Sequence, residues 1–143
     1  MFMGEYNHSV DAKGRLIIPV SYREALGNEF VVTKGLDRCL FAFPKSEWQI
    51  MEEKLKVLPI TSKGARDFIR YLVPGATICE LDRQGRILLP ARLREYAGLE
   101  KDVVLAGMLS RVEIWNKDSW QAYTSAEDMD AIAQQLADLG LNI

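Results

Sequence analysis

The stretch DAKGRLIIP at Asp11–Pro19 decides how the rest of the sequence is interpreted, because it occurs again as DRQGRILLP at Asp82–Pro90. The copies stand about half of the 143-residue chain apart and keep Asp, Gly, Arg and Pro in the same order. In both, aliphatic residues stand between the arginine and the proline. Such an internal repeat indicates one structural unit present twice. We therefore expect two similar halves.

Each copy has the pattern of a strand, a tight turn and a second strand. Glu5–Val10 precedes the first turn and Ala76–Leu81 precedes the second. Gly14 and Gly85 stand where a turn with positive φ requires glycine. The aliphatic triplets that follow predict strands buried on both faces, each ended by its proline.

Further elements follow both copies in the same order: a short helix, a second hairpin and an amphipathic helix with a tryptophan. Ser21 is expected to cap the first short helix, and Ser46–Gln49 has the form of a capping box. We predict that Trp48 and Trp120 pack in the interior. The predicted elements are Ser21–Gly27, Phe30–Thr33, Cys39–Phe43, Ser46–Leu58, Ala91–Ala97, Val103–Leu105 and Val112–Trp115.

The chain divides into four parts on this pattern. They are a first repeat with its helix (1–59), a connecting helix (60–75), a second repeat (76–124) and an acidic C-terminal helix (125–143). Two of these helices are predicted over 61–73 and 125–139. The apolar stripe of the C-terminal helix, which predicts docking on the body or on a neighbouring subunit, is Met129, Ile132, Leu136 and Leu139.

Composition limits the function classes. Cys39 and Cys79 lie far apart and outside any C-x-x-C pattern, so we expect buried core cysteines, with no disulfide framework and no metal site. His8 is the one histidine, which argues against a histidine metal cluster or a Ser-His-Asp triad. We expect no cofactor and no enzymatic activity. No apolar run is long enough for a membrane span, and the start lacks a signal-peptide pattern, so we expect a cytosolic protein.

Charge is distributed unevenly although its net value is only −2. Residues 125–143 hold four acidic residues and no Lys or Arg, so the preceding part is net positive. A local patch matters more for phosphate binding than whole-chain charge. The bases at and just after the repeated turns are Lys13, Arg15, Arg23, Arg83, Arg86, Arg92 and Arg94.

Asp11 and Arg15 flank the first turn, as Asp82 and Arg86 flank the second, so each carboxylate can orient its guanidinium. A held arginine suits phosphate oxygens or the acceptor edge of guanine. We expect Lys13 and Arg23 to flank the first arginine, and Arg83 and Arg94 to flank the second. Alternatively, Asp and Gly only form the turn, and Arg pairs with Asp for modest stability. The residues alone leave both interpretations open.

The motifs together resemble the MraZ family, bacterial regulators associated with the division and cell-wall gene cluster, over essentially the full length. The resemblance rests on the paired D-x-x-x-R turns, the ordered tryptophans and a Pro-x-x-x-Arg-Glu after each turn. It also rests on three segments, the start Met1–Tyr6, then Pro19–Glu24 and Pro90–Glu95.

This resemblance implies an α+β fold with two tandem double-split β-barrel repeats of the AbrB-like swapped-hairpin type, with peripheral helices, sharing one compact body. It implies a ring-shaped homo-oligomer, an octamer, that binds double-stranded DNA at short direct repeats upstream of its own operon, and a nucleoid-associated location. The rival hypothesis is a ring-forming assembly protein whose Asp/Arg loops make subunit contacts. The predicted DNA-binding residues are Asp11, Lys13, Gly14, Arg15, Arg23, Asp82, Arg83, Gly85, Arg86 and Arg94.

Overall fold

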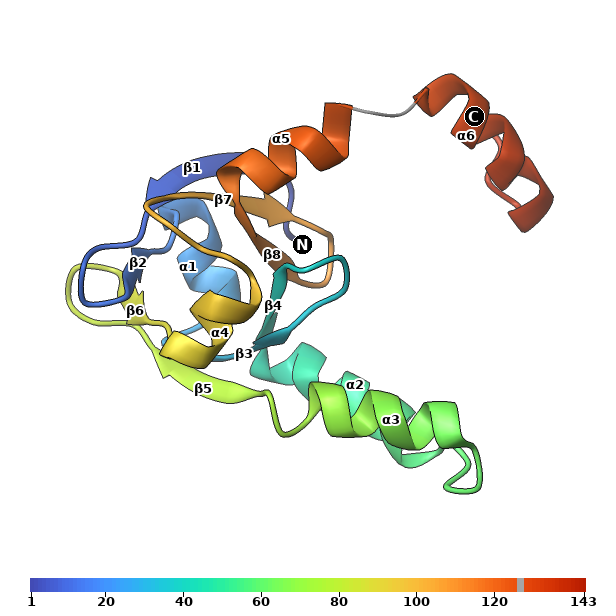
Figure 1. Ribbon diagram of the computed structural model, residues 1–143, viewed down its shortest axis with the longest axis horizontal. Helices are drawn as coiled ribbons and strands as arrows, with labels where there is room; N and C mark the ends of the chain where they lie inside the picture. The colour runs from blue at the N-terminus through green and yellow to red at the C-terminus, as the bar shows by residue number, and fades with distance from the viewer. Residues whose placement is uncertain (126–127) are drawn as a thin grey trace.

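The computed structural model describes residues 1–125 and 128–143 and shows an α+β protein built on a six-stranded antiparallel sheet (Figure 1). The sheet order is β1-β7-β8-β4-β3-β5, and β2 and β6 form a separate two-stranded sheet. The strands are β1 (Glu5–Ser9), β2 (Arg15–Ile17), β3 (Glu29–Lys34), β4 (Leu40–Pro44), β5 (Thr77–Glu80), β6 (Arg86–Leu88), β7 (Asp102–Gly107) and β8 (Val112–Asn116). The helices are α1 (Val20–Leu26), α2 (Lys45–Lys56), α3 (Lys63–Leu72), α4 (Ala91–Tyr96), α5 (Lys117–Ser125) and α6 (Met129–Leu136), followed by a 3-10 turn (Ala137–Leu139).

The two halves of the chain are interleaved. The predicted hairpins β3–β4 and β7–β8 are confirmed. The hairpins expected across the repeated turns are wrong, because β1 pairs with β7, β2 pairs with β6 and β5 pairs with β3. Across the first turn, Val10 and Leu16 form only an isolated bridge. This exchange lets aliphatic side chains of both halves enter one shared core.

The aliphatic triplets after the turn arginines alternate between buried and exposed, so the expected burial on both faces is wrong. Leu16 and Ile18 are fully buried, whereas 39% of Ile17 is exposed. In the second copy, Ile87 and Leu89 are buried and 62% of Leu88 is exposed. A two-stranded sheet packs only one face on the core, so alternate side chains point away from it.

The helix starts differ from the predicted caps. Pro19 and Pro44 occupy the cap positions of α1 and α2 without a side-chain cap hydrogen bond, so the capping roles expected of Ser21 and of Ser46–Gln49 are wrong. Both prolines have extended backbone (ψ 137° and 151°) and immediately precede their helix, which places the serines inside the first turn. The connecting helix starts after Ser62, whose Oγ accepts a hydrogen bond from the Ala65 amide at 3.2 Å.

Two apolar clusters lie on opposite faces of the large sheet. The first contains the buried triplet residues and takes Tyr22, Leu26 and Leu93 from α1 and α4. The second contains Phe41, Phe43 and Trp115 and is covered in part by three half-buried side chains, Trp48, Met51 and Trp120. The predicted packing role of the two helical tryptophans is therefore confirmed.

Both cysteines are buried in these clusters, as predicted. Burial raises the pKa of Cys39 to about 12 and that of Cys79 to about 11. The thiols are therefore protonated and unreactive near neutral pH.

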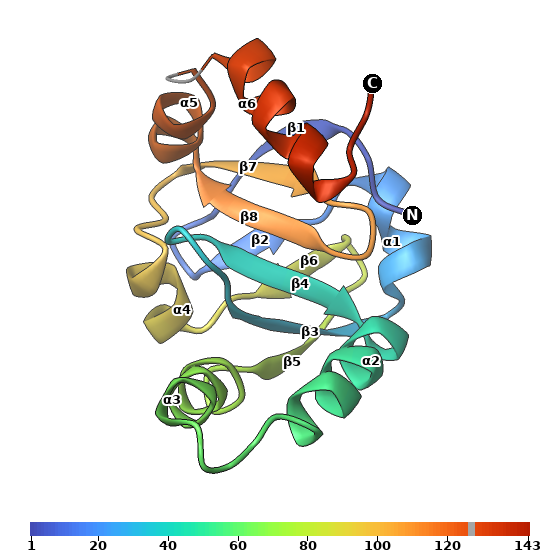
Figure 2. The same cartoon turned by 90° about the vertical axis from the view of Figure 1, so that its right-hand side faces the viewer.

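The C-terminal helix begins later than predicted. Ser125 ends α5, and Asp128 is the cap of α6, its carboxylate accepting from the amides of Asp130 and Ala131. Residues 126 and 127 of the predicted helix lie outside the described residues. Within the described part of the chain, neither apolar cluster includes a residue of α6. Figure 1 shows α6 apart from the body, and in the turned view of Figure 2 it overlaps the upper strands. The stripe therefore joins neither cluster, and its packing on the body or on a neighbouring subunit stays a prediction. None of the described helices is long and apolar enough to cross a membrane.

Candidate nucleic-acid interface

The first repeated turn is organised by the side chain of Asp11. Its Oδ1 accepts hydrogen bonds from the amides of Lys13 and Arg15, each at 2.9 Å. Its Oδ2 accepts from Nε of Arg15 at 2.8 Å. The backbone closes the turn, because the Gly14 amide donates to the Asp11 carbonyl at 3.0 Å while Gly14 adopts a φ of 85°. A carboxylate thus holds the turn and the arginine together.

The second turn repeats this geometry. Oδ1 of Asp82 accepts from the amides of Gln84 and Arg86 at 2.9 Å, and Oδ2 accepts from Nε of Arg86 at 2.9 Å. Gly85 has a φ of 75°, and its amide donates to the Asp82 carbonyl at 3.0 Å. The predicted pairing of Asp with Arg across each turn is confirmed in both copies. The two arginines are therefore presented in the same way.

The hydrogen bonds lower the pKa of both carboxyl groups below the usual range. The largest cause is the amide of Arg15 for Asp11 and the amide of Arg86 for Asp82, and the guanidinium contributes further. The carboxylates therefore stay charged at any physiological pH. Each arginine keeps a permanent partner that fixes its orientation.

The neighbouring arginines cross between the repeats, which corrects the sequence-based grouping. Arg23 lies against Gly85 of the second turn, and Arg94 lies against Gly14 of the first. Each is anchored at its own helix, Nε of Arg23 donating to the Ile18 carbonyl at 2.8 Å and Nε of Arg94 to the Leu89 carbonyl at 3.1 Å. The antiparallel pairing of β2 with β6 causes the exchange, because it brings the end of each strand beside the opposite turn.

Backbone hydrogen bonds tie the two turns into one structure. The Ile18 amide donates to the Gly85 carbonyl, and the Leu89 amide donates to the Gly14 carbonyl, both at 2.9 Å. The turns lie at the same end of the molecule, on the left in Figure 1. The structure therefore brings the predicted residues of both copies together at one surface.

The exposure of the side chains suits contact with a large ligand. Lys13 and Arg83 are exposed, and the side chains of Arg15 and Arg86 are 34% and 24% exposed. Arg92, also noted as a nearby base, instead donates from Nη1 to the Gly75 carbonyl at 2.9 Å. The surface is thus formed by four accessible bases, with Arg23 and Arg94 half-buried behind them.

His8 is a neighbour of this surface that the sequence did not identify. It lies on β1, half-buried, and its pKa is lowered first by burial and then by the charge of Arg23. Only the strand pairing places it there, and no motif marks it. His8 is therefore neutral near neutral pH, and the positive charge of the surface comes from its arginines and Lys13.

Comparison with known proteins identifies the family of the chain. The sequence model described as "MraZ protein, putative antitoxin-like" matches residues 1–71 and again residues 72–140. A protein of Desulfitobacterium hafniense named "Transcriptional regulator MraZ" is 59% identical over 99% of this chain and all of its own length. Proteins of the same name from Pelotomaculum thermopropionicum and Clostridium beijerinckii are 57% and 55% identical over 100% and 99% of this chain, and over all of their own lengths. The chain belongs to the MraZ family.

Proposed function

We propose that the chain is a transcriptional regulator that binds double-stranded DNA through its two D-x-x-x-R turns. The observation that carries the proposal is the presence of two identical carboxylate-held arginines, Arg15 and Arg86, at one surface. The name that the relatives carry, transcriptional regulator, supports it. The target is the family's expected one, short direct repeats upstream of the protein's own operon in the division and cell-wall gene cluster.

Different side chains take different roles in this proposal. Arg15 and Arg86 contact base edges, because a guanidinium held at Nε keeps its other donors in a fixed plane. Lys13 and Arg83 contact phosphates, which position the protein without reading sequence. Arg23 and Arg94 support the opposite turns and add positive charge. Gln84 stands where the first turn has Lys13, so the two turns contribute unequally.

Several subunits act together. The local patch on one chain is small, and a chain with a net charge of −2 gains little from long-range attraction to DNA. We propose a ring-shaped homo-oligomer, of eight subunits as the family resemblance implies, that engages several direct repeats at once and raises affinity through effective concentration. Binding of this kind takes place in the cytoplasm on the nucleoid. The swapped-hairpin, double-split β-barrel description of each repeat belongs to the same proposal, and the pairing of β2 with β6 supports it.

The test is the double variant Arg15→Ala, Arg86→Ala, titrated with operator DNA by fluorescence anisotropy at several salt concentrations. We expect a loss of about 1–3 kcal/mol for each arginine. Lys13→Ala, Arg83→Ala is the comparison, and it should weaken binding to all sequences and flatten the salt dependence. Undiminished operator binding by the Arg15/Arg86 variant would refute the proposal.

The rival assembly function makes a different prediction for the same variant. If the turn arginines bond to carboxylates of a neighbouring subunit, the double variant should dissociate to smaller species in light scattering. The observed pairing within each turn argues against this, because Asp11 and Asp82 already hold the arginines of their own chain. We expect the variant to keep the mass of the wild-type assembly.

A further inference from the structure

The two repeated turns have the same backbone geometry but different residues at their tips. In each turn the glycine amide donates to the aspartate carbonyl at 3.0 Å, so the two residues between them are the central residues of a β-turn. These central residues are Ala12 and Lys13 in the first turn, and Arg83 and Gln84 in the second. All four are exposed. The tips are therefore the part of the two turns that presents different groups to a ligand.

The formal charge of the two tips is the same. Each tip has one basic residue and one uncharged residue, but the base is the second central residue in the first turn, Lys13, and the first central residue in the second turn, Arg83. Attraction to phosphates depends on the number of positive charges near the DNA, and this number is equal for the two tips. The difference between the tips therefore leaves the attraction to the DNA backbone balanced and changes the groups that the bases meet.

Gln84 presents an uncharged polar side chain that is free to bind a ligand. Its backbone amide donates to Oδ1 of Asp82 at 2.9 Å, which fixes the point from which the side chain starts. Among residues 1–125 and 128–143, no protein group forms a hydrogen bond with its carboxamide. The second turn thus holds one more acceptor and one more donor group in water.

The positions of Gln84 and Arg86 are fixed by the same carboxylate oxygen. The Arg86 amide also donates to Oδ1 of Asp82 at 2.9 Å. Consecutive Cα atoms lie about 3.8 Å apart, so the side chains of Gln84 and Arg86 start within about 7.6 Å of each other. This distance corresponds to about two steps of about 3.4 Å along a DNA strand. When Arg86 contacts a base edge, Gln84 therefore lies over the same base pair or a neighbouring one.

A carboxamide is complementary to adenine. Its oxygen accepts and its nitrogen donates, whereas the major-groove edge of adenine offers the N6 amino group as a donor beside the acceptor N7, so both hydrogen bonds form together. Guanine offers two acceptors on this edge, N7 and O6, and leaves the carboxamide oxygen without a partner. A lysine has donors only, so Lys13 cannot make the same selection.

We propose that Gln84 reads a base and selects adenine in the sequence that the second turn contacts. This inference rests on the proposed function, because it requires the turns to enter the major groove of DNA. It adds a third base-reading residue to Arg15 and Arg86. Since the first turn has Lys13 at the equivalent position, the two turns of one chain recognise different short sequences, and only the second requires this adenine.

The test is selection by the full-length protein from a library of randomised DNA duplexes, followed by sequencing. The wild type should enrich a recurring sequence that contains the adenine, and Gln84→Ala should keep the rest of that sequence and lose the adenine. Competition anisotropy then compares the selected duplex with one in which a G·C pair replaces that A·T pair. The wild type should prefer the A·T duplex roughly tenfold, and Gln84→Ala should bind the two equally. The salt dependence should stay unchanged, because this variant removes no charge.

Two exchange variants test the assignment by a change of preference instead of a loss. Gln84→Lys gives the second turn the residue of the first, and it should select guanine at this position, because lysine pairs with O6 and N7 of guanine. Lys13→Gln should add an adenine to the sequence that the first turn contacts. A misfolded variant would lose binding to all duplexes and would not acquire a new preference.

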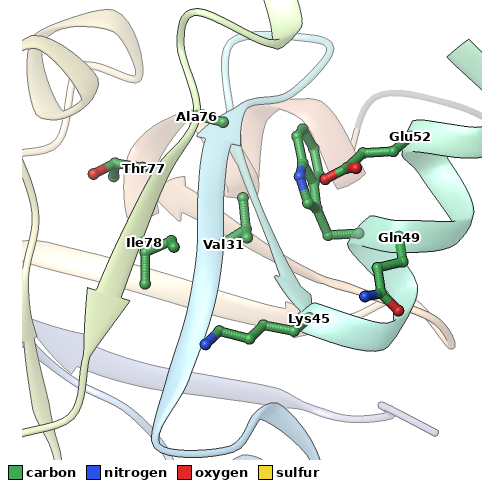
Figure 3. A pocket seen from close by; sticks show the side chains of 8 residues that line it. Val31, Lys45, Gln49, Glu52, Ala76, Thr77 and Ile78 are labelled. Carbon is green, nitrogen blue, oxygen red and sulfur yellow. The ribbon is translucent and has the colours of Figure 1, made fainter. Parts of the chain in front are cut away.

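Gln49→Ala is the matched control. Gln49 is an exposed glutamine on α2, where it lines a hollow of about 300 Å³ beside Ile78 (Figure 3). The helix lies away from the repeated turns (Figure 1), so this variant should keep the wild-type preference. An adenine preference that survives Gln84→Ala, or a wild-type sequence without the adenine, would overturn the inference alone. A wild type that enriches no sequence would overturn the proposed function as well.

Discussion

Arg23 of the first repeat lies against Gly85 of the second. Its guanidinium fills the space that a side chain at Gly85 would need. A Cβ built on Gly85 would lie 2.2 Å from Cζ of Arg23, and one built on Gly14 would lie 2.8 Å from Cζ of Arg94. The glycines thus serve two purposes, a positive φ and room for an arginine of the opposite repeat. Each turn is supported by the other half of the chain.

Gly85→Ala should destabilise the protein by roughly 2 kcal/mol in urea denaturation. About 1 kcal/mol comes from placing a side chain at positive φ. A similar amount, about 1 kcal/mol, is lost when Arg23 moves aside and gives up its hydrogen bond to the Ile18 carbonyl. DNA affinity should fall as well, because the second turn loses its support.

Gly98→Ala is the matched control for that variant. Gly98 also has a positive φ, 61°, but a Cβ there would meet nothing within 4 Å. Gly98→Ala should therefore lower the free energy of unfolding only by the cost of a side chain at positive φ, about 1 kcal/mol. Equal losses of stability at Gly85 and Gly98 would show that the contact with Arg23 contributes nothing. If the contact contributes, adding Arg23→Ala to Gly85→Ala should recover part of the lost stability.

The alternation in the triplet Ile87–Leu89, which begins in β6 and ends just after it, gives a second prediction. Leu89→Ala should lower the free energy of unfolding by about 2–5 kcal/mol, because the side chain is fully buried in the shared core. Leu88→Ala, at a residue 62% exposed, should change it by no more than about 0.5 kcal/mol. Chemical denaturation of the two variants measures the difference. Similar losses would mean that both faces of this stretch are buried, as the aliphatic triplet alone suggested.

The repeated turns could be predicted from the sequence because their contacts are local. Asp11 bonds to the amides two and four residues later, and Gly14 lies between them, so the pattern of residue types specifies the geometry. The same holds for Asp82 in the second copy. Duplication then placed an equivalent arginine in each turn.

The grouping of Arg23 and Arg94 could not be predicted in this way. Each stands a few residues after its own turn in sequence, but β2 pairs with β6, and this long-range pairing carries each arginine to the opposite turn.

The position of α6 could not be predicted from the sequence either. Its apolar stripe was evident, but a stripe does not say which surface it covers.

The lowered pKa values of Asp11 and Asp82 give a pH prediction. The folded-state pKa lies below the unfolded value of 3.8, so the stabilisation is complete above pH 3.8 and is lost as pH falls through the lowered pKa. The variant Asp11→Asn, Asp82→Asn has no such charge to lose. Its melting temperature should therefore fall less steeply than that of the wild type below pH 3.8, as measured by circular dichroism. Parallel curves would show that the two carboxylates contribute no acid dependence.

The last prediction concerns the shape of the turn arginines rather than their charge. Nε of Arg15 and Nε of Arg86 are engaged by the aspartates, so recognition depends on the other donors of the guanidinium. Lysine has a single nitrogen and cannot pair with the aspartate and read a base edge in the same plane. The variant Arg15→Lys, Arg86→Lys should keep its affinity for random DNA and its salt dependence, since the charge is unchanged.

The preference of the Arg15→Lys, Arg86→Lys variant for operator over random DNA should fall roughly tenfold or more, because a bidentate base contact is lost in each turn. Competition titrations with both DNAs measure this ratio. Arg66→Lys is the control, an arginine on α3 whose Nη1 donates to the Ile60 carbonyl, and it should leave the ratio unchanged. If the Lys variant keeps the wild-type ratio, the turn arginines contact phosphates only, and sequence must be read by other residues of the interface.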